Sequence, residues 1–446
     1  MSAKTLLRGG TVLTLGARTP NHVEADVLIA DGRIAEVGRG LRARDAEVVD
    51  ARDTIVMPGF VDTHRHAWRA LLRNLGGGDP GLDGASSVET YRLRHGPDDV
   101  YAATLLSLLS AVETGITTVV DWSDVPPGPR HTEAALQAHA DAGVRTVFVH
   151  AAIERAEDAA DRDRALRQLV ADRAPDPKGL TTIAAGVPEP SLSDLASVTT
   201  RWSQARELGL RIHAHVGTDH TGRGVVAGLG FRGLLGPDVT LVHCTHLGDD
   251  DLDAIATQRV AVSLAPPSEM ARGLGAPPLQ GLLDRDVRPG LGVDDERIAP
   301  GEMFAQMRAV QSLQHATVFE RKLAGKAGLP AMLTTREVIR HATVDGARVA
   351  GLAEVTGSLE PGKQADVLVL RTDRPNIFPV NDPIGAVVWG MDPSNVDWVF
   401  VAGHPLVRAG VLEADDTRAR DLATAARDRV LAEVGRTAGA SGGGVR

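Results

Sequence analysis

Residues 57–66, MPGFVDTHRH, decide the fold class of this chain. A short apolar run there ends in two histidines, His64 and His66, which are two positions apart. Residues i and i+2 of a β-strand share a face, so both imidazoles can converge on one ion. The same alternation places Asp62 one step deeper on that face and turns Arg65 away from it. Because the C-terminal ends of barrel strands form the active-site face, the stretch predicts a first barrel strand that ends at a metal site.

Outward from this stretch, apolar runs alternate with helical segments between residues 54 and 351. Eight runs have the pattern of strands, namely TIVMPGFVDT, ITTVVD, VRTVFVH, TTIAAGV, LRIHAHV, VTLVHC, RVAVSLA and VRPGLGVD. Helices are expected between them, for example at residues 98–113, 131–142, 192–208 and 249–257. Eight such units over roughly 300 residues fit an α/β fold of the (β/α)8 or TIM-barrel type. A doubly wound open sheet is the alternative, which the strand count alone does not exclude.

The two ends of the chain have a different pattern. Residues 4–50 contain short strands separated by turns, including a hairpin signal at Asp31-Gly32. Strands return after residue 352, in TGSLEPGKQADVLVL and VDWVFVAGHPLVRAG, and could complete the sheet begun at the N-terminus. We therefore predict three parts: a composite β-sandwich from 1–53 and 352–415, a barrel from 54–351, and a C-terminal helix with a flexible tail from 416–446.

Composition narrows the class of protein. The chain has 446 residues, 43% of them hydrophobic, and a formal net charge of −10, which argues against binding a nucleic-acid polymer. Its single cysteine, Cys244, allows no intrachain disulfide. Neither a signal peptide nor an apolar run of about 18 residues is evident, so we expect no membrane association and a cytoplasmic location.

Two further stretches carry histidines at predicted strand ends. In RIHAHVGT, His215 is nearer the C-terminal end than His213, which we expect to be a hydrogen-bonded core residue. In LVHCTHL, His243 and His246 would face opposite ways on a continuous strand. We expect His243 to face inward and His246 to begin the next loop, and we interpret Cys244 as a small buried apolar residue.

The eighth run ends in PGLGVDDE, which contains the adjacent aspartates Asp294 and Asp295. Only one of two adjacent side chains on a strand can face inward. A carboxylate at this point can bind both a metal and the water on it. Three imidazoles and one carboxylate suit a divalent metal with room for water, and the metal lowers the pKa of that water towards ~7.

These motifs, in this order, resemble the amidohydrolase superfamily, in the branch of cytosine and guanine deaminases and triazine hydrolases. The residues that carry the resemblance are MPGFVDTHRH, RIHAHVGT, LVHCTHL, LGVDDE, HATVDGARVAGL and GSLEPGKQADVLVL. The resemblance extends from LLRGGTVLTL to VFVAGHPLV, which is nearly the whole chain. It implies a (β/α)8 barrel with a composite β-sandwich built from both termini.

The resemblance also implies a ligand set and a metal. His64, His66, His215 and Asp294 would bind it, and His243 would contact the substrate or the attacking water. Zn²⁺ is the usual metal of the branch, and Fe²⁺ is possible. Members with two metals bridge them with a carboxylated lysine on the fourth strand, but TTIAAGV contains no lysine, so we expect one divalent metal per chain.

One position departs from the branch. Its deaminases carry His-x-x-Glu after the fifth strand, where the glutamate shuttles protons, but here Thr218 follows His215 at that spacing. Glu269 in APPSEM and Glu189 in VPEPS are the candidate replacements, although a loop glutamate is usually only solvated. Our predicted catalytic set is therefore Asp294, His243 and Glu269.

Three functions remain open at this point. The first is hydrolysis of a non-peptide C–N bond in a small heterocyclic substrate, with deamination as the predicted reaction; Asp294 would take the proton of water and His243 would stabilise the developing charge. The second, favoured by the missing glutamate, is a non-hydrolytic metal enzyme such as a decarboxylase or another lyase. The third is a non-catalytic relative. Arg65 and Trp68 either shape a pocket for a flat or anionic substrate or merely pack, and the apolar helix at 301–323 predicts a homodimer.

Overall fold

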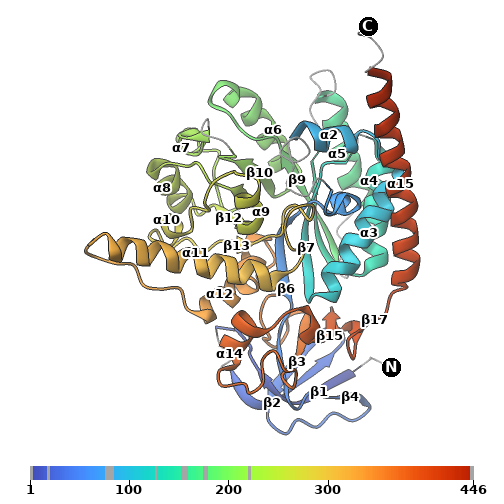
Figure 1. The fold of residues 1–446 in the computed structure, drawn as a ribbon, viewed down its shortest axis with the longest axis vertical. Helices are drawn as coiled ribbons and strands as arrows, with labels where there is room; N and C mark the ends of the chain where they lie inside the picture. Colours follow the sequence, from blue (N-terminus) through green and yellow to red (C-terminus); the bar gives the residue numbers. More distant parts are fainter. Residues whose placement is uncertain are drawn as a thin grey trace.

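The computed structural model describes residues 4–17, 21–75, 85–125, 128–151, 159–173, 179–218 and 222–441, and within them the chain forms two sheets. Eight strands make one sheet in chain order, and their pairings are parallel. They are β6 (Phe60–Arg65), β7 (Ile116–Ser123), β8 (Arg145–His150), β9 (Thr181–Val187), β10 (Ile212–Val216), β11 (Val239–His243), β12 (Ala261–Leu264) and β13 (Gly290–Leu291). Figure 1 shows this sheet in the upper part of the molecule, with helices around it.

The first and last strands of this sheet meet, which closes it into a barrel. The backbone N–H of Asp294, just after β13, donates to the carbonyl of His64 at 2.8 Å, and the N–H of His66 donates to the carbonyl of Asp294 at 3.1 Å. Arg65 and Asp294 form an isolated parallel bridge at the same point. The predicted (β/α)8 barrel is therefore confirmed, and the open sheet, whose edge strands stay apart, is excluded.

Helices cover the outside of the barrel, and their starts agree with local sequence signals. α3 (Pro97–Glu113) begins with a proline and has two aspartates in its first turn, where the helix dipole favours acidic groups. α8 (Asp249–Thr257) has the predicted bounds. The other helices and helical turns of the barrel are η1 (Ala67–Leu72), α2 (Ala85–Arg92), α4 (Pro129–Ala142), α5 (Ala159–Asp172), η3 (Leu192–Asp194), α6 (Leu195–Glu207), α7 (Val225–Phe231), α9 (Pro266–Ala271), α10 (Leu279–Leu283), α11 (Met303–Leu323), α12 (Thr335–His341) and α13 (Val344–Val349).

The second sheet combines both ends of the chain. Its strand order is β17-β16-β15-β14-β5-β1-β2-β3, with β4 also paired to β1. N-terminal β5 pairs with C-terminal β14, which joins the two halves as predicted for the composite domain. The strands are β1 (Lys4–Val12), β2 (His22–Ala30), β3 (Arg33–Gly38), β4 (Ala46–Asp50), β5 (Thr54–Pro58), β14 (Val367–Arg371), β15 (Val396–Val401), β16 (His404–Arg408) and β17 (Val411–Leu412). The turns α14 (Pro383–Gly385), η5 (Ala386–Gly390) and η6 (Pro393–Asn395) lie between β14 and β15.

The run TIVMPGFVDT, predicted as one barrel strand, is divided between the two sheets. Residues 54–58 pair with β14 in the composite sheet, and only Phe60 onwards belongs to the barrel. Gly59 is the crossing point, and a Cβ there would lie 2.1 Å from the Oγ1 of Thr117, so only glycine fits. The barrel sheet therefore starts at Phe60 rather than at residue 54; the other predicted domain boundaries stay a prediction.

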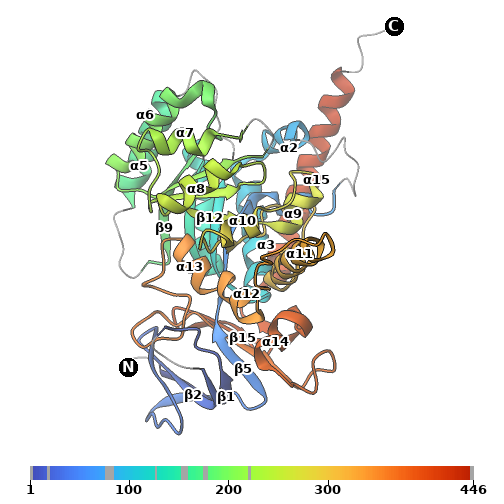
Figure 2. The same ribbon diagram turned by 90° about the vertical axis from the view of Figure 1, so that its left-hand side faces the viewer.

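The C-terminal helix α15 (Asp416–Ser441) occupies most of the 416–446 segment that was predicted to hold a helix and a flexible tail. It runs along the side of the barrel, and Arg429 pairs with Asp99 of α3. The end of the predicted flexible tail, residues 442–446, lies outside the described residues. Figure 2 shows the composite sheet below the barrel, with β5 leading up towards it. In the described part of the chain, every helix is too short or too polar to span a membrane.

Candidate metal centre

The four predicted metal ligands come together at the C-terminal end of the barrel. Nε2 of His64 lies 3.1 Å from Nε2 of His215 and 3.5 Å from Oδ1 of Asp294. Nε2 of His66 lies 3.4 Å from the same oxygen. These residues come from β6 and the position just after it, from β10 and from the turn after β13, so the barrel strands bring together groups that are far apart in the sequence.

The environment of Asp294 fits a bound cation. Its Oδ1 is buried and has no hydrogen-bond partner in the described part of the chain. Its Oδ2 accepts hydrogen bonds from the hydroxyl of Ser268 at 2.6 Å and from Arg272 at 3.2 Å. An unpaired carboxylate oxygen is costly to bury, whereas a divalent metal among three imidazoles would satisfy it. Burial opposes ionisation of Asp294, but the nearby imidazole of His64 and the charge of Arg272 hold its pKa well below the ordinary value.

His64 and His215, two of the predicted ligands, are suited to metal binding because burial keeps them neutral. Desolvation lowers the pKa of His64 to about 4 and holds the pKa of His215 well below the ordinary value. A neutral imidazole has a free lone pair for a metal, and a charged one does not.

Asp124, which the sequence analysis missed, orients His66. Its Oδ1 lies 2.8 Å from Nδ1 of His66, which leaves Nε2 for the metal, as carboxylate–histidine–metal arrangements require. The same carboxylate accepts from Nε1 of Trp68 at 2.6 Å and from Arg69 at 3.3 Å. Burial would raise the pKa of Asp124, but the charges of His66 and Arg69 outweigh it and hold that pKa far below the usual range. Its only sequence signal was its position directly after the strand ITTVVDWS.

His243 enters the site through an unusual backbone conformation. Leu241, two positions earlier, belongs to the apolar core outside the barrel, so a regular strand would turn His243 outward as well. His243 instead has a φ of 73°, in the left-handed region that non-glycine residues rarely adopt. Its ring stacks on that of His215, with centroids 5.2 Å apart and planes inclined by 12°. A ring nitrogen of His243 thereby comes into one cluster with His64 and Asp294.

Glu269 contacts His243 directly. Its Oε1 lies 3.1 Å from Nδ1 of His243 and also accepts the backbone N–H of Ala265. Burial raises the pKa of Glu269, and the hydrogen bond with His243 partly opposes that effect. The short helix α9 thus serves two groups at once, because Glu269 holds His243 while Ser268, with Arg272 just beyond the helix, holds Asp294. Sequence analysis missed Ser268 and Arg272; their only signal was their position beside Glu269.

Three neighbouring residues lie outside the cluster. His213 is buried one layer below, but neither ring nitrogen has a hydrogen-bond partner in the described structure, so the expected hydrogen-bonded core histidine is wrong in that respect. Burial and the charge of Arg211 lower the pKa of His213 to about 3. His246 lies in the turn after β11 and Cys244 is fully buried, as expected.

Asp62 and Arg65 do not lie on opposite sides of the strand, contrary to the prediction. Nε of Arg65 donates to Oδ2 of Asp62 at 2.7 Å, and Nη1 lies 3.0 Å from Oε1 of Glu296. The pairing register of β6 shifts between these two residues, so simple alternation fails there. Oδ1 of Asp62 accepts the backbone N–H groups of His64 and Val293. Both side chains are fully buried, so Arg65 supports the strand ends and does not shape a substrate pocket.

Thr218 and Glu189 meet at the rim of the barrel. The hydroxyl of Thr218 donates to Oε2 of Glu189 at 2.6 Å, and the N–H of Thr218 donates to Oε1 at 3.1 Å. They lie just after β10 and β9, which are neighbouring strands of the barrel. Glu189 is exposed, and Thr218 follows His215 by three positions.

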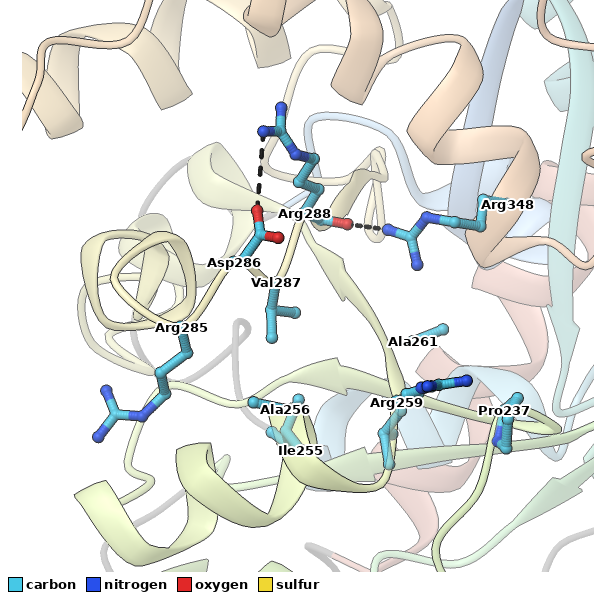
Figure 3. A pocket seen from close by; sticks show the side chains of 11 residues that line it. Pro237, Ile255, Ala256, Arg259, Ala261, Arg285, Asp286, Val287, Arg288 and Arg348 are labelled. Carbon is cyan, nitrogen blue, oxygen red and sulfur yellow. Dashed lines mark hydrogen bonds and ion pairs between the residues drawn. The ribbon is translucent and has the colours of Figure 1, made fainter.

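A cavity of about 570 Å³ lies at the other end of the barrel, where β12 and β13 begin (Figure 3). Several arginines line this cavity, and three of them form ion pairs or hydrogen bonds with nearby residues. Arg285 pairs with Asp253 at 2.6 Å, Arg288 pairs with Asp286 at 3.7 Å, and Arg348 donates to the carbonyl of Arg288. This cavity is remote from the histidine cluster, so the candidate active site is the C-terminal mouth.

A closed (β/α)8 barrel with a histidine–aspartate cluster at its mouth defines a metal-dependent hydrolase of the amidohydrolase kind. The profile of the amidohydrolase family matches residues 55–406, and the chain belongs to that family. It is an enzyme that hydrolyses C–N bonds other than peptide bonds with the help of a divalent metal.

Several curated relatives match over almost their whole length. A 5′-deoxyadenosine deaminase of Methanothermobacter thermautotrophicus is 30% identical over 421 residues, which cover 90% of this chain and 93% of the relative. A 5-methylthioadenosine/S-adenosylhomocysteine deaminase of Desulfitobacterium hafniense is 28% identical, with coverages of 93% and 96%.

Solved structures of related proteins have the same fold. An adenosine deaminase from Xanthomonas campestris with bound zinc superposes with a TM-score of 0.82 at 22% identity, covering 96% of this chain and 99% of that one. Atrazine chlorohydrolase from Arthrobacter aurescens, complexed with zinc, gives a TM-score of 0.81 at 22% identity, with coverages of 95% and 100%. At 22% identity, the similarity to these structures establishes the fold alone.

Proposed function

We propose that this chain is a mononuclear zinc enzyme that removes the 6-amino group of an adenine nucleoside modified at its 5′ position. The observation that carries the proposal is the unpaired Oδ1 of Asp294, which faces Nε2 of His64 and of His66. His64, His66 and His215 form one group of three nitrogens, and Asp294 shares a second group with His64. Together they offer three nitrogens and one oxygen, which suits Zn²⁺ with a position left for water. The substrate class rests on the names of the curated relatives, which act on adenine nucleosides that differ at the 5′ carbon.

An aromatic wall beside the centre supports a flat substrate. The ring of Trp122 lies 4.2 Å from that of His215 and 6.0 Å from that of His64. A purine entering the mouth can pack against this indole while its amino-bearing carbon approaches the centre.

The roles of the residues follow from their contacts. Bound zinc would supply the Lewis acidity that makes water a nucleophile near neutral pH. Asp294 accepts a proton from the attacking water through Oδ1, because Ser268 and Arg272 already occupy Oδ2. His243 uses Nδ1 to contact Glu269, so its Nε2 is left to bind the substrate where negative charge develops. We assign Glu269, expected from the sequence to be a proton donor, the role of positioning His243.

A substrate panel tests the proposal. Zinc-loaded enzyme should release ammonia from 5′-deoxyadenosine, 5′-methylthioadenosine, S-adenosylhomocysteine and adenosine, and chelator-treated enzyme should not. Cytosine, guanine, a pterin and an aminotriazine serve as the alternatives. Ammonia release from one of these alternatives but from no adenine nucleoside would refute the substrate class, and metal-independent release would refute the role of zinc.

The other two functions considered above have little support. The comparisons give no sign of a decarboxylase or another lyase, and the curated relatives described here are deaminases. A non-catalytic relative would not need to keep the cluster of candidate ligands or the unpaired Oδ1 of Asp294. It would also not need the side chains that hold these groups in place.

We also propose that the enzyme is a cytoplasmic homodimer. α11 and the loop after it expose Phe319, Leu323, Leu329 and Met332, and Leu323 is 87% exposed. Figure 1 shows that α11 extends well beyond the barrel, where a second copy could cover it. Sedimentation of the wild type and of Leu323→Glu tests this idea: the wild type should sediment as two chains and the variant as one, and a monomeric wild type would refute it. Cell fractionation tests the location.

A further inference from the structure

Release of ammonia from a ring carbon requires a proton donor, because a neutral amino group is a poor leaving group. We examined the described acidic residues that lie within five positions after the end of a barrel strand. Four of them pair with arginine: Asp124 with Arg69, Asp294 with Arg272, Asp295 with Arg69 and Arg297, and Glu296 with Arg65 and Arg73. The remaining two, Glu189 and Glu269, have no ion pair with an arginine in the part of the chain that the structure describes.

Glu269 is poorly placed to reach a leaving group. It is fully buried, and its Oε1 is occupied by Nδ1 of His243 and the N–H of Ala265. Through Oε1, Glu269 therefore contacts His243, and its Oε2 is buried without a hydrogen-bond partner in the described residues. Glu269 is thus engaged in holding His243, the ring that is needed at the developing negative charge.

Glu189 has the opposite properties. Its carboxylate is exposed at the rim, and both oxygens are held by one residue, through the hydroxyl and the N–H of Thr218. Two hydrogen bonds to the two oxygens fix the plane of the carboxylate and its direction. Thr218 follows the predicted ligand His215 by three positions, so the pair lies past the strand end that carries this histidine.

We propose that Glu189, held by Thr218, is the proton donor to the departing amino group, an inference that rests on the proposed deaminase function. As the C–N bond breaks, its electron pair stays on nitrogen, and the Glu189 carboxyl transfers its proton to that nitrogen. The attacking water forms the new C–O bond and gives up two protons, the first of them to Asp294. One of the two ends on the ring nitrogen and the other returns to Glu189, so the products are a ring carbonyl and ammonia.

This arrangement explains why threonine can stand at position 218. The carboxylate is supplied by the neighbouring strand end, after β9, and the threonine side chain serves as its holder. The carboxylate of Glu189 thus follows one strand, and Thr218, which holds it, follows the neighbouring strand.

The decisive variant is Glu189→Gln, which keeps the size and a hydrogen-bond acceptor but cannot carry a proton. With an adenine nucleoside, kcat should fall about 10²–10⁴-fold while KM and zinc content change little. With the matching 6-chloropurine nucleoside the loss should be less than about tenfold, because chloride leaves without a proton. Thr218→Val removes the hydroxyl that holds Oε2. Its kcat with an adenine nucleoside should lie between those of the wild type and Glu189→Gln.

The matched control is Glu207→Gln, because Glu207 is a well-exposed glutamate at the end of α6 and pairs with Arg167. It should keep wild-type kinetics on both substrates. A Glu189→Gln enzyme within twofold of an active wild type, or equally impaired on the amino and chloro substrates, overturns the proposed proton donor alone. A wild type that releases no ammonia from any adenine nucleoside overturns the proposed function, and this inference with it.

Discussion

The hydroxyl of Ser268 donates to Oδ2 of Asp294 at 2.6 Å, so the oxygen that stays free is the one facing the histidines. This hydrogen bond fixes the direction of the carboxylate. Ser268→Ala should therefore lower zinc affinity about 10–100-fold, the usual effect of removing a group that orients a metal ligand. Competition with a chelator of known affinity, read by absorbance, measures the change. Ser191→Ala, at an exposed serine beyond β9, is the control, and equal affinities of the two variants would contradict the orienting role.

His66→Ala should remove one ligand and with it most of the bound metal and the activity. Elemental analysis of wild type and variant, purified side by side, makes the comparison. The wild type should hold about one zinc per chain. Full metal in the variant would exclude His66 from the ligands, and two metals per wild-type chain would refute the mononuclear site. His404→Ala, at an exposed position on β16, is the control and should keep its metal.

Arg65→Met should destabilise the fold. The guanidinium of Arg65 neutralises Asp62 and Glu296, and all three side chains are nearly inaccessible to solvent. Removing the guanidinium takes this partner away from two buried carboxylates. Breaking a buried ion pair lowers the free energy of unfolding by about 3–5 kcal/mol. Thermal unfolding of the metal-free protein should show a clearly lower Tm. Arg420→Met, at an exposed pair on α15, should be near neutral, and similar Tm values for both variants would refute the prediction.

His150 should make the fold less stable in acid. Burial lowers its pKa from 6.5 to about 4 in the folded chain. Between these values the unfolded chain binds more protons than the folded chain, so stability is full above about pH 6.5 and declines as pH falls towards about 4. Such a shift corresponds to about 3 kcal/mol. His150→Gln should flatten this part of the profile in denaturant titrations from pH 7 to 4, whereas an unchanged slope would show that His150 is not responsible. Exposed His404→Gln should leave the slope as it is.

The barrel and the meeting of the candidate ligands could be predicted because they depend on repeating patterns. Strand–helix alternation recurs over the whole barrel, and His64, His66 and His215 lie at strand ends where the barrel geometry brings them together. The entry of His243 into the site was predicted, but its cause was not. It depends on a φ of 73° at the end of β11, which the residue types there do not signal.

Other features could not be predicted because they depend on contacts between distant segments. The division of TIVMPGFVDT follows from the pairing of β5 with β14, which no local pattern shows. The pairing of Asp62 with Arg65 follows from an irregular register, while strict alternation predicted the opposite. Asp124 and Ser268 are single polar residues after strands, and only the folded structure shows that they contact the predicted ligands His66 and Asp294.

The pairing of β5 with β14 also affects how the chain can fold during synthesis. Position 56 of β5 pairs with position 369 of β14, so just over 300 residues must be made before the two strands can meet. At about 5–20 residues per second, a ribosome needs roughly 15–60 s for that stretch. Throughout this interval one edge of β5 remains unpaired, and unpaired edges readily join strands of other chains. The nascent enzyme should therefore depend on chaperones until its C-terminal strands emerge, which in-cell folding with and without chaperone depletion can measure.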